Sequence, residues 1–143
     1  MSTSGVNPYL RTKVLTASPA ELRLMLFDGA IKFLEQGRQG IEERNYEQMF
    51  NGISKCQNIL VELMNGLVPK HAPELCEKLS ALYTFMYTQL IKACSERDVE
   101  VLEEVLKLLR YERETWAMLM SRLTDEGTEA EVETNDGSVS VSG

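Results

Sequence analysis

The residue types that most often carry out chemistry are few in this chain and are poorly placed for it. The only histidine, His71, lies between Pro69 and Pro73, in a segment that we expect to be a connection rather than a helix. A di-metal site in a helical bundle needs Glu-x-x-His pairs that project inward from facing helices. A phosphoryl relay needs a histidine on a helix face. We therefore expect His71 to be a solvated loop residue and the chain to bind no metal.

The cysteines are equally weak candidates for catalysis. Cys56, Cys76 and Cys94 are too far apart in sequence to form a local metal-binding motif, and each falls on or beside an apolar helical stripe. We interpret them as reduced, buried, small hydrophobic residues. The sequence also contains no Walker loop, no dinucleotide-binding motif and no evident pair of nucleophile and base. It thus predicts a protein that is not an enzyme and uses no cofactor.

Charge and hydropathy exclude further classes. The net charge is −7, and six of the acidic residues lie in residues 124–143, which contain no Lys or Arg. Residues 1–123 are nearly neutral, and neither part has the basic stripe that binding to a phosphate backbone requires, so we expect no nucleic-acid partner. No apolar run is long enough to span a bilayer, and the N-terminus does not resemble a secretory signal. We therefore predict a cytoplasmic protein without direct membrane insertion.

Four long amphipathic segments are predicted to be helices. The first begins at Ser18, where Ser18 and Glu21 can form a capping box and Pro19 occupies the first helical position. It runs to about Gln39, where nearby glycines weaken it. The other three helices are predicted over residues 45–67, 73–94 and 98–123, with short connections between them. Short connections favour antiparallel neighbours, so the expected fold is all-α, an up-down-up-down four-helix bundle.

The two ends of the chain are expected to differ from this bundle, which covers residues 18–123. Residues 1–17 form a leader in which Tyr9, Leu10, Val14 and Leu15 are spaced for one or two helical turns. An unfolded leader has little use for these apolar residues, so we expect it to pack on the bundle. Residues 124–143 are dominated by Gly, Ser, Thr, Glu and Asp, which predicts a disordered acidic tail.

The first long helix has more apolar surface than a single core contact needs. At about 100° per residue its apolar residues fall into two stripes whose centres lie roughly 140° apart. One stripe contains Leu22, Met25, Leu26, Gly29, Ala30 and Phe33, and the other contains Leu24, Phe27, Ile31 and Leu34. A peripheral helix in a bundle buries a face of limited width, so the second stripe should meet the leader, a partner protein or another copy of the chain. The alternative is an irregular bundle that wraps this helix from both sides.

Other helices also carry apolar residues away from their core stripes. Ile59 and Val61 lie on the second long helix, and Phe85 and Ile91 lie on the third. Scattered exposed apolar residues are normal in proteins. Together with the second stripe of the first helix, however, they could form a groove that accepts an amphipathic helix or an extended segment of a partner.

At this point the residues resemble a known family. Residues 16–22 (TASPAEL), followed by residues 25–30 (MLFDGA), look like the opening signature of the flagellin export chaperones, the FliS family. The residues around Leu82 and Leu90, the turn before Asp98, and residues 113–116 (RETW) resemble the family's other landmarks. The resemblance covers roughly residues 7–123. One departure is Phe27, where the family often has tyrosine, and this change leaves the apolar contact intact.

The resemblance implies a fold and a function. The family is an antiparallel helical bundle with an N-terminal segment, and it binds the C-terminal region of flagellin in the cytoplasm. This prevents premature polymerisation and keeps flagellin competent for flagellar type III secretion. The family's leader, whose tyrosine is matched by Tyr9, can occupy part of the groove when flagellin is absent. Other flagellar export components are further candidate partners.

Together these arguments predict particular site residues. Leu24, Phe27, Ile31 and Leu34 are expected to line the client groove, and Asp28 could bond the leader or the client backbone. Tyr9, Leu10 and Val14 are expected to cover the groove in the free state. Two other readings stay open at this stage: a generic helical adaptor or oligomerisation module that binds an amphipathic partner segment, and a small bundle enzyme or metal protein.

Overall fold

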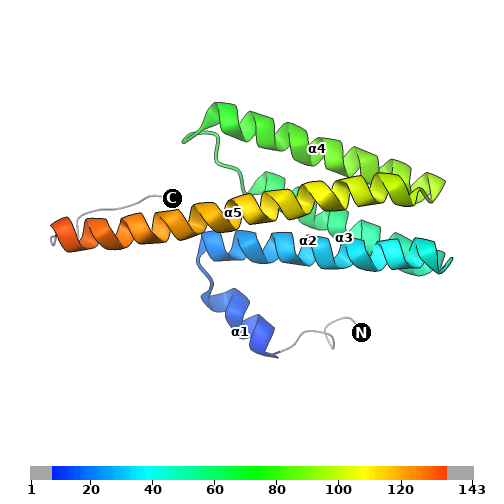
Figure 1. Cartoon of the computed structure of the whole chain (residues 1–143), viewed down its shortest axis with the longest axis horizontal. Coiled ribbons are helices and arrows are strands. Elements are labelled where there is room, and N and C mark those ends of the chain that lie inside the picture. The colour runs from blue at the N-terminus through cyan, green and yellow to red at the C-terminus, as the bar shows by residue number, and fades with distance from the viewer. Residues whose placement is uncertain (1–7, 135–143) are drawn as a thin grey trace.

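The structure, a computed structural model, describes residues 8–134, with side chains described as far as residue 123. A short helix, α1 (Pro8–Thr16), precedes four long ones: α2 (Pro19–Glu42), α3 (Tyr46–Asn65), α4 (Pro73–Glu96) and α5 (Val99–Thr134) (Figure 1). Over this part of the chain there is no strand. The predicted all-α fold class is therefore confirmed.

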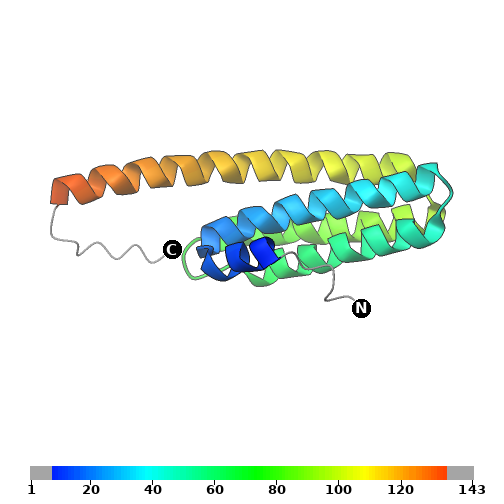
Figure 2. The same ribbon diagram turned by 90° about the horizontal axis from the view of Figure 1, so that it is seen from below.

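The four long helices lie lengthwise against one another and form a bundle. Successive helices run in opposite directions, and the turns at one end of the bundle join α2 to α3 and α4 to α5 (Figures 1 and 2). Helix α2 packs against α3 and α5, and α4 also packs against α3 and α5, so each helix has two principal neighbours. The buried apolar side chains of all four helices form one core.

Side-chain caps begin three of the long helices, as their sequences predict. The Ser18 hydroxyl accepts from the Glu21 N–H at 3.1 Å, while the Glu21 carboxylate accepts from the Ser18 N–H at 2.9 Å. Pro19 follows at the first helical position. These hydrogen bonds from Ser18 lower the pKa of Glu21. Asn45 and Asp98 accept first-turn N–H groups of α3 and α5 in the same way.

Helix α5 is longer than predicted. The sequence predicts an end at Leu123 and disorder beyond it, whereas α5 continues to Thr134. Residues 124–134 contain four glutamates and an alanine, which favour a helix, and also a glycine and three threonines, which do not, so neither propensity nor apolar surface explains this extension. The rest of the predicted tail, residues 135–143, lies outside the described residues.

The leader forms the predicted helix, but it does not pack as expected. Every residue of α1 is exposed, including Tyr9 at 72%, Leu10 at 48% and Val14 at 41%. At 100° per residue, the apolar side chains from Tyr9 to Leu15 spread over about two thirds of the helix circumference. Such a helix has no apolar side to place against the bundle. The expectation that these residues cover a groove is therefore not met in this structure.

Candidate functional site

The buried face of α2 differs from the predicted one. Its fully buried positions are Phe27, Ala30, Leu34, Gly37 and Gly40, which follow one line between the two predicted stripes. Phe27 is 2% exposed and Leu34 is 0% exposed, so both belong to the core. Neither side chain is open to a client in this structure, and their role in a client groove stays a prediction.

The neighbours of α2 explain this difference. Because α3 lies on one side of α2 and α5 on the other, the two predicted stripes flank a single core line and are both partly covered. Ile31 packs against the core, and Leu24 is half-buried. The bundle thus wraps α2 from both sides, which was the alternative left open by the sequence.

Ion pairs line the side of α2 that faces α5. The Arg113 Nε donates to Asp28 Oδ1 at 2.9 Å, Arg110 pairs with Glu35, and Arg38 lies 3.7 Å from Glu103. Hydrogen bonding to Asp28 raises the pKa of Arg113. These pairs are exposed and each adds little to stability. In this structure Asp28 is bonded to Arg113 of the bundle, and a bond from Asp28 to the leader or to a client stays a prediction.

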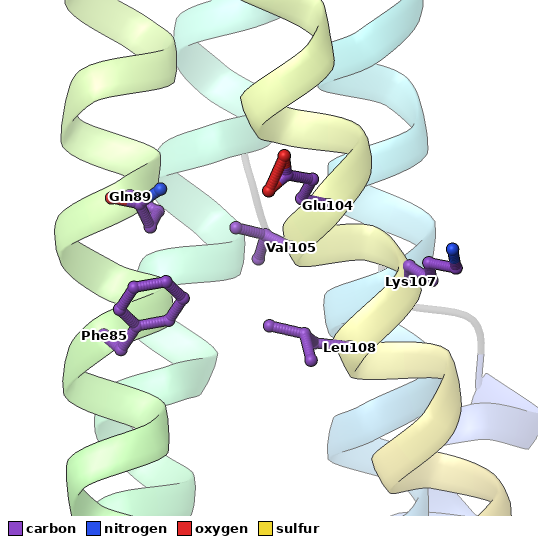
Figure 3. A pocket seen from close by; sticks show the side chains of 6 residues that line it. All are labelled: Phe85, Gln89, Glu104, Val105, Lys107 and Leu108. Carbon is purple, nitrogen blue, oxygen red and sulfur yellow. The ribbon is translucent and has the colours of Figure 1, made fainter.

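A pocket opens between α4 and α5 instead. It has a volume of about 240 Å³ and is lined by Phe85 and Gln89 of α4 and by Glu104, Val105, Lys107 and Leu108 of α5. Phe85 points toward Val105 and Leu108 across the space between the helices (Figure 3). Half of the Phe85 side chain, 51%, remains exposed to solvent. The pocket therefore presents an aromatic ring and two aliphatic side chains to anything that binds there.

Apolar side chains continue beyond the pocket in the direction of the α4 N-terminus. On α4, Leu82 lies three residues before Phe85 and Leu75 lies ten residues before it, and both share its side of the helix. On α5, Leu119 and Leu123 follow Leu108 on the same side of the helix. Leu75, Leu119 and Leu123 are all exposed. Helix α4 diverges from α5 along this stretch (Figure 1). We call these six residues, Leu75, Leu82, Phe85, Leu108, Leu119 and Leu123, the α4–α5 surface.

The sequence pointed to only part of this surface. Phe85 was identified from its position off the core stripe, and it is exposed, as are Val61 and Ile91. Leu119 and Leu123, by contrast, lie in the predicted helix over residues 98–123 and were not singled out as surface residues. Their exposure follows from the lengths of the helices: α5 has 36 residues and α4 has 24, so the last apolar residues of α5 run beyond their neighbours. The sequence, which predicts that this helix ends at Leu123, holds no clear signal of the overhang.

A half-buried arginine lies at the same end of the bundle. Arg23 donates to the Leu63 carbonyl at 3.2 Å and to the Tyr83 hydroxyl at 2.9 Å. Its guanidinium carbon lies 5.8 Å from the centroid of the Tyr83 ring and 5.5 Å from that of Trp116. The Trp116 indole N–H in turn donates to the Ala20 carbonyl at 3.0 Å. The Arg23 side chain therefore extends into the core of the bundle.

Burial controls the protonation of two groups beside Arg23. It raises the pKa of Tyr83, and attraction to Arg23 offsets part of that effect. Burial also raises the pKa of Glu112 on α5, again partly offset by Arg23. Both shifts follow from the low polarity of the surroundings, in which a charged oxygen loses hydration.

The histidine and the three cysteines occupy ordinary positions in the helices and connections of the bundle. His71 is exposed in the connection between α3 and α4, and Cys56 is buried while Cys76 and Cys94 are half-buried. Within the described residues, no three His, Cys, Asp or Glu side chains come together as metal ligands. None of the described helices combines the length and the apolar character needed to cross a membrane.

Fold and surface together define a small helical bundle with an apolar surface open between two of its helices. The profile of the flagellar protein FliS matches residues 2–123, which is most of the chain, and the chain belongs to this family. The flagellar secretion chaperone FliS of Bacillus subtilis strain 168 is 35% identical over 113 residues, which cover 77% of this chain and 84% of the relative.

Two further relatives carry the same name. The flagellar secretion chaperone FliS of Salmonella typhimurium strain LT2 is 33% identical over 121 residues, 81% of this chain and 90% of the relative. That of Escherichia coli strain K12 is 32% identical over 108 residues, 75% of this chain and 79% of the relative. The chain is therefore a flagellar export chaperone and not an enzyme.

Proposed function

We propose that this chaperone binds the C-terminal segment of flagellin in the cytoplasm and holds it on the α4–α5 surface. Covering the apolar face of that segment prevents premature polymerisation and keeps flagellin competent for type III secretion. The observation that carries the proposal is the half-exposed Phe85 ring at the pocket, together with the exposed Leu75, Leu119 and Leu123 that continue the apolar surface beyond it. Membership in a family of flagellar secretion chaperones supports the class of client.

The dimensions of the surface suit an amphipathic helix. Along α5, the distance from Leu108 to Leu123 is about 22 Å at 1.5 Å per residue. A client helix of about four turns has the same length and can present an apolar side chain every three or four residues. Glu104 and Lys107 at the edge of the pocket carry opposite charges. An apolar centre with a polar rim is the usual anatomy of such an interface.

Release must occur without a nucleotide-driven step in this chain, because its sequence contains no nucleotide-binding motif. A client that is unfolded alone loses conformational entropy when it becomes ordered on the chaperone. That loss lowers the affinity obtained from a given contact area. The complex can therefore be specific and still dissociate when export begins.

The test compares two exposed phenylalanines. Phe85 is 51% exposed on α4, and Phe50 is 58% exposed on α3, away from the α4–α5 surface. Phe85→Ala should weaken binding of a flagellin C-terminal peptide by roughly tenfold or more, measured by calorimetry, because aromatic anchors dominate such interfaces. Phe50→Ala removes the same group from another face and should bind within about twofold of the wild type. Equal affinities of the two variants would indicate that the client binds a different surface.

A further inference from the structure

Arg23 is an unusual residue to find inside a helical bundle. None of the ion pairs among the described side chains includes it. Its hydrogen bonds go to a backbone carbonyl and a phenol, and its guanidinium lies over the rings of Phe27, Tyr83 and Trp116 at 6.0, 5.8 and 5.5 Å. Partly burying a guanidinium that no carboxylate bonds directly is unfavourable unless its donors and its flat faces are used. Here both are used, and the contacts reach every long helix. Attraction to Glu112 on α5 adds to those contacts.

These contacts connect the four long helices at one position along the length of the bundle. Arg23 belongs to α2, and it bonds α3 through the Leu63 carbonyl and α4 through the Tyr83 hydroxyl. It reaches α5 through the ring of Trp116, which is itself anchored to α2 by the Ala20 carbonyl. The guanidinium, which belongs to the second turn of α2, therefore contacts both α4 and α5.

On the α4 side, the contact fixes the rotation of the helix about its axis. Tyr83 is 1% exposed and is held toward the core by Arg23. Phe85 follows two residues later, which places it about 200° further around the helix, on nearly the opposite side. Holding Tyr83 inward therefore keeps Phe85 turned outward over the pocket.

On the α5 side, the contact fixes the start of the exposed stretch. Trp116 precedes Leu119 by three residues, so the two side chains lie within one turn of each other. With its ring against Arg23 and its N–H bonded to Ala20, Trp116 sets where the following turns of α5 leave the bundle.

From this geometry we propose that Arg23 is a positioning residue that sets the placement of α4 relative to α5 and so shapes the α4–α5 surface for its client. Arg23 acts through Tyr83 and Trp116 and does not itself line the surface. The consequence for client binding rests on the proposed function. The effect of Arg23 on the placement of α4 and α5 in the free protein does not depend on the proposed function.

The first measurement is made on the free protein and compares Arg23→Met with Arg38→Met. Arg38 is a matched control because it lies on the same helix and also contacts α5, through Glu103 at 3.7 Å. In Arg23→Met, amide hydrogen exchange in residues 73–85 and 110–123 should be roughly fivefold faster or more, with exchange in α2 and α3 nearly unchanged outside the turns that carry Arg23 and Leu63. Arg38→Met should show no such local change. Exchange that is unaltered, or that rises evenly along the whole bundle, would overturn the proposal.

The second measurement is the affinity for a flagellin C-terminal peptide. Arg23→Met should bind roughly fivefold more weakly or worse, and Arg38→Met within about twofold of the wild type. Arg23→Met with altered exchange but unchanged affinity would overturn the role in client binding. If the wild-type protein itself does not bind the peptide, the proposed function fails, and the exchange pattern still decides whether Arg23 positions α4 and α5.

A milder variant keeps the test usable if Arg23→Met does not fold. Arg23→Lys retains the charge but loses the planar fork that bonds Leu63 and Tyr83 and lies over the rings. Its exchange and affinity should change in the same direction as those of Arg23→Met, to a smaller extent. Wild-type values for Arg23→Lys in both measurements would show that a positive charge alone is sufficient, which contradicts the proposed geometry.

Discussion

The backbone of Gly52 on α3 lies directly against that of Gly37 on α2. A methyl group on Gly52 would stand 2.6 Å from the Gly37 nitrogen and 2.6 Å from the Phe33 carbonyl oxygen. Both are backbone atoms inside a helix, so they cannot move aside unless α2 moves as a whole. The close packing of α2 on α3 therefore requires glycine at this position.

Gly52→Ala should lower the free energy of unfolding by about 2 kcal/mol or more, because overpacking outweighs the better helix propensity of alanine. Denaturant unfolding followed by circular dichroism measures this. The control is Gly29→Ala, whose new methyl group would meet only the Ile59 Cδ1 at 3.3 Å. That side-chain end can move, so the control should be nearly neutral. If Gly52→Ala left the free energy of unfolding unchanged, α2 and α3 could move apart without loss of stability.

Glu112 should make stability depend on pH. Because burial raises its pKa above the ordinary 4.5, the folded state holds the proton more tightly than the unfolded chain does, and stability falls as the pH rises through the folded-state pKa. Glu112→Gln mimics the protonated form. It should raise the unfolding temperature at about pH 7 by no more than about 3 °C, since the side chain is half-exposed, and leave it unchanged below about pH 4. An equal gain at both pH values would exclude the charge as the cause.

Removal of the leader should have little effect on stability. No residue of α1 is buried, and the cap at Ser18 that begins α2 lies beyond it. Deleting residues 1–16 should change the free energy of unfolding by less than about 0.5 kcal/mol, as for other exposed sites. Thermal unfolding of the full and shortened chains measures this. A loss of several degrees in the shortened chain would indicate that the leader packs on the bundle in solution.

The cysteines should differ in reactivity. Burial raises the pKa of the Cys56 thiol to about 12, and Cys56 is fully enclosed, whereas Cys76 and Cys94 are half-buried. In the folded protein a thiol reagent should modify Cys56 at least about a hundredfold more slowly than Cys76, because the reactive thiolate is both scarce and covered. Mass spectrometry of digested samples assigns the modified site. Rapid labelling of Cys56 without denaturant would reveal frequent opening of the core.

Local signals made most of the fold predictable. Ser18, Pro19 and Glu21 mark the start of α2 through hydrogen bonds within four residues of sequence, so no knowledge of the tertiary structure is needed. The same holds for the caps at Asn45 and Asp98. The end of α5 was harder to predict, because residues 124–134 combine helix-forming side chains with the low apolar content that is typical of disorder.

The site was less predictable, because it depends on how helices face one another. Periodicity shows that α2 is apolar on two sides, but it does not show which residues the neighbouring helices cover. The observed core line takes Phe27 and Leu34 from one predicted stripe, Ala30 from the other, and adds Gly37 and Gly40. Arginine is usually exposed, so nothing in the local sequence marks Arg23 as a residue of the core. Its contacts with Tyr83 and Trp116 come from segments 60 or more residues away in sequence.

Trp116 is the only tryptophan in the chain, and it lies where α5 crosses the first turn of α2. Tryptophan fluorescence, excited so that the five tyrosines do not contribute, therefore observes this junction alone, whereas far-ultraviolet circular dichroism sums over all the helices. If the two signals change together on heating, the bundle melts as one cooperative unit; if fluorescence changes first, this end loosens before the rest. The chain thus carries its own spectroscopic reporter at the end where α4 and α5 separate.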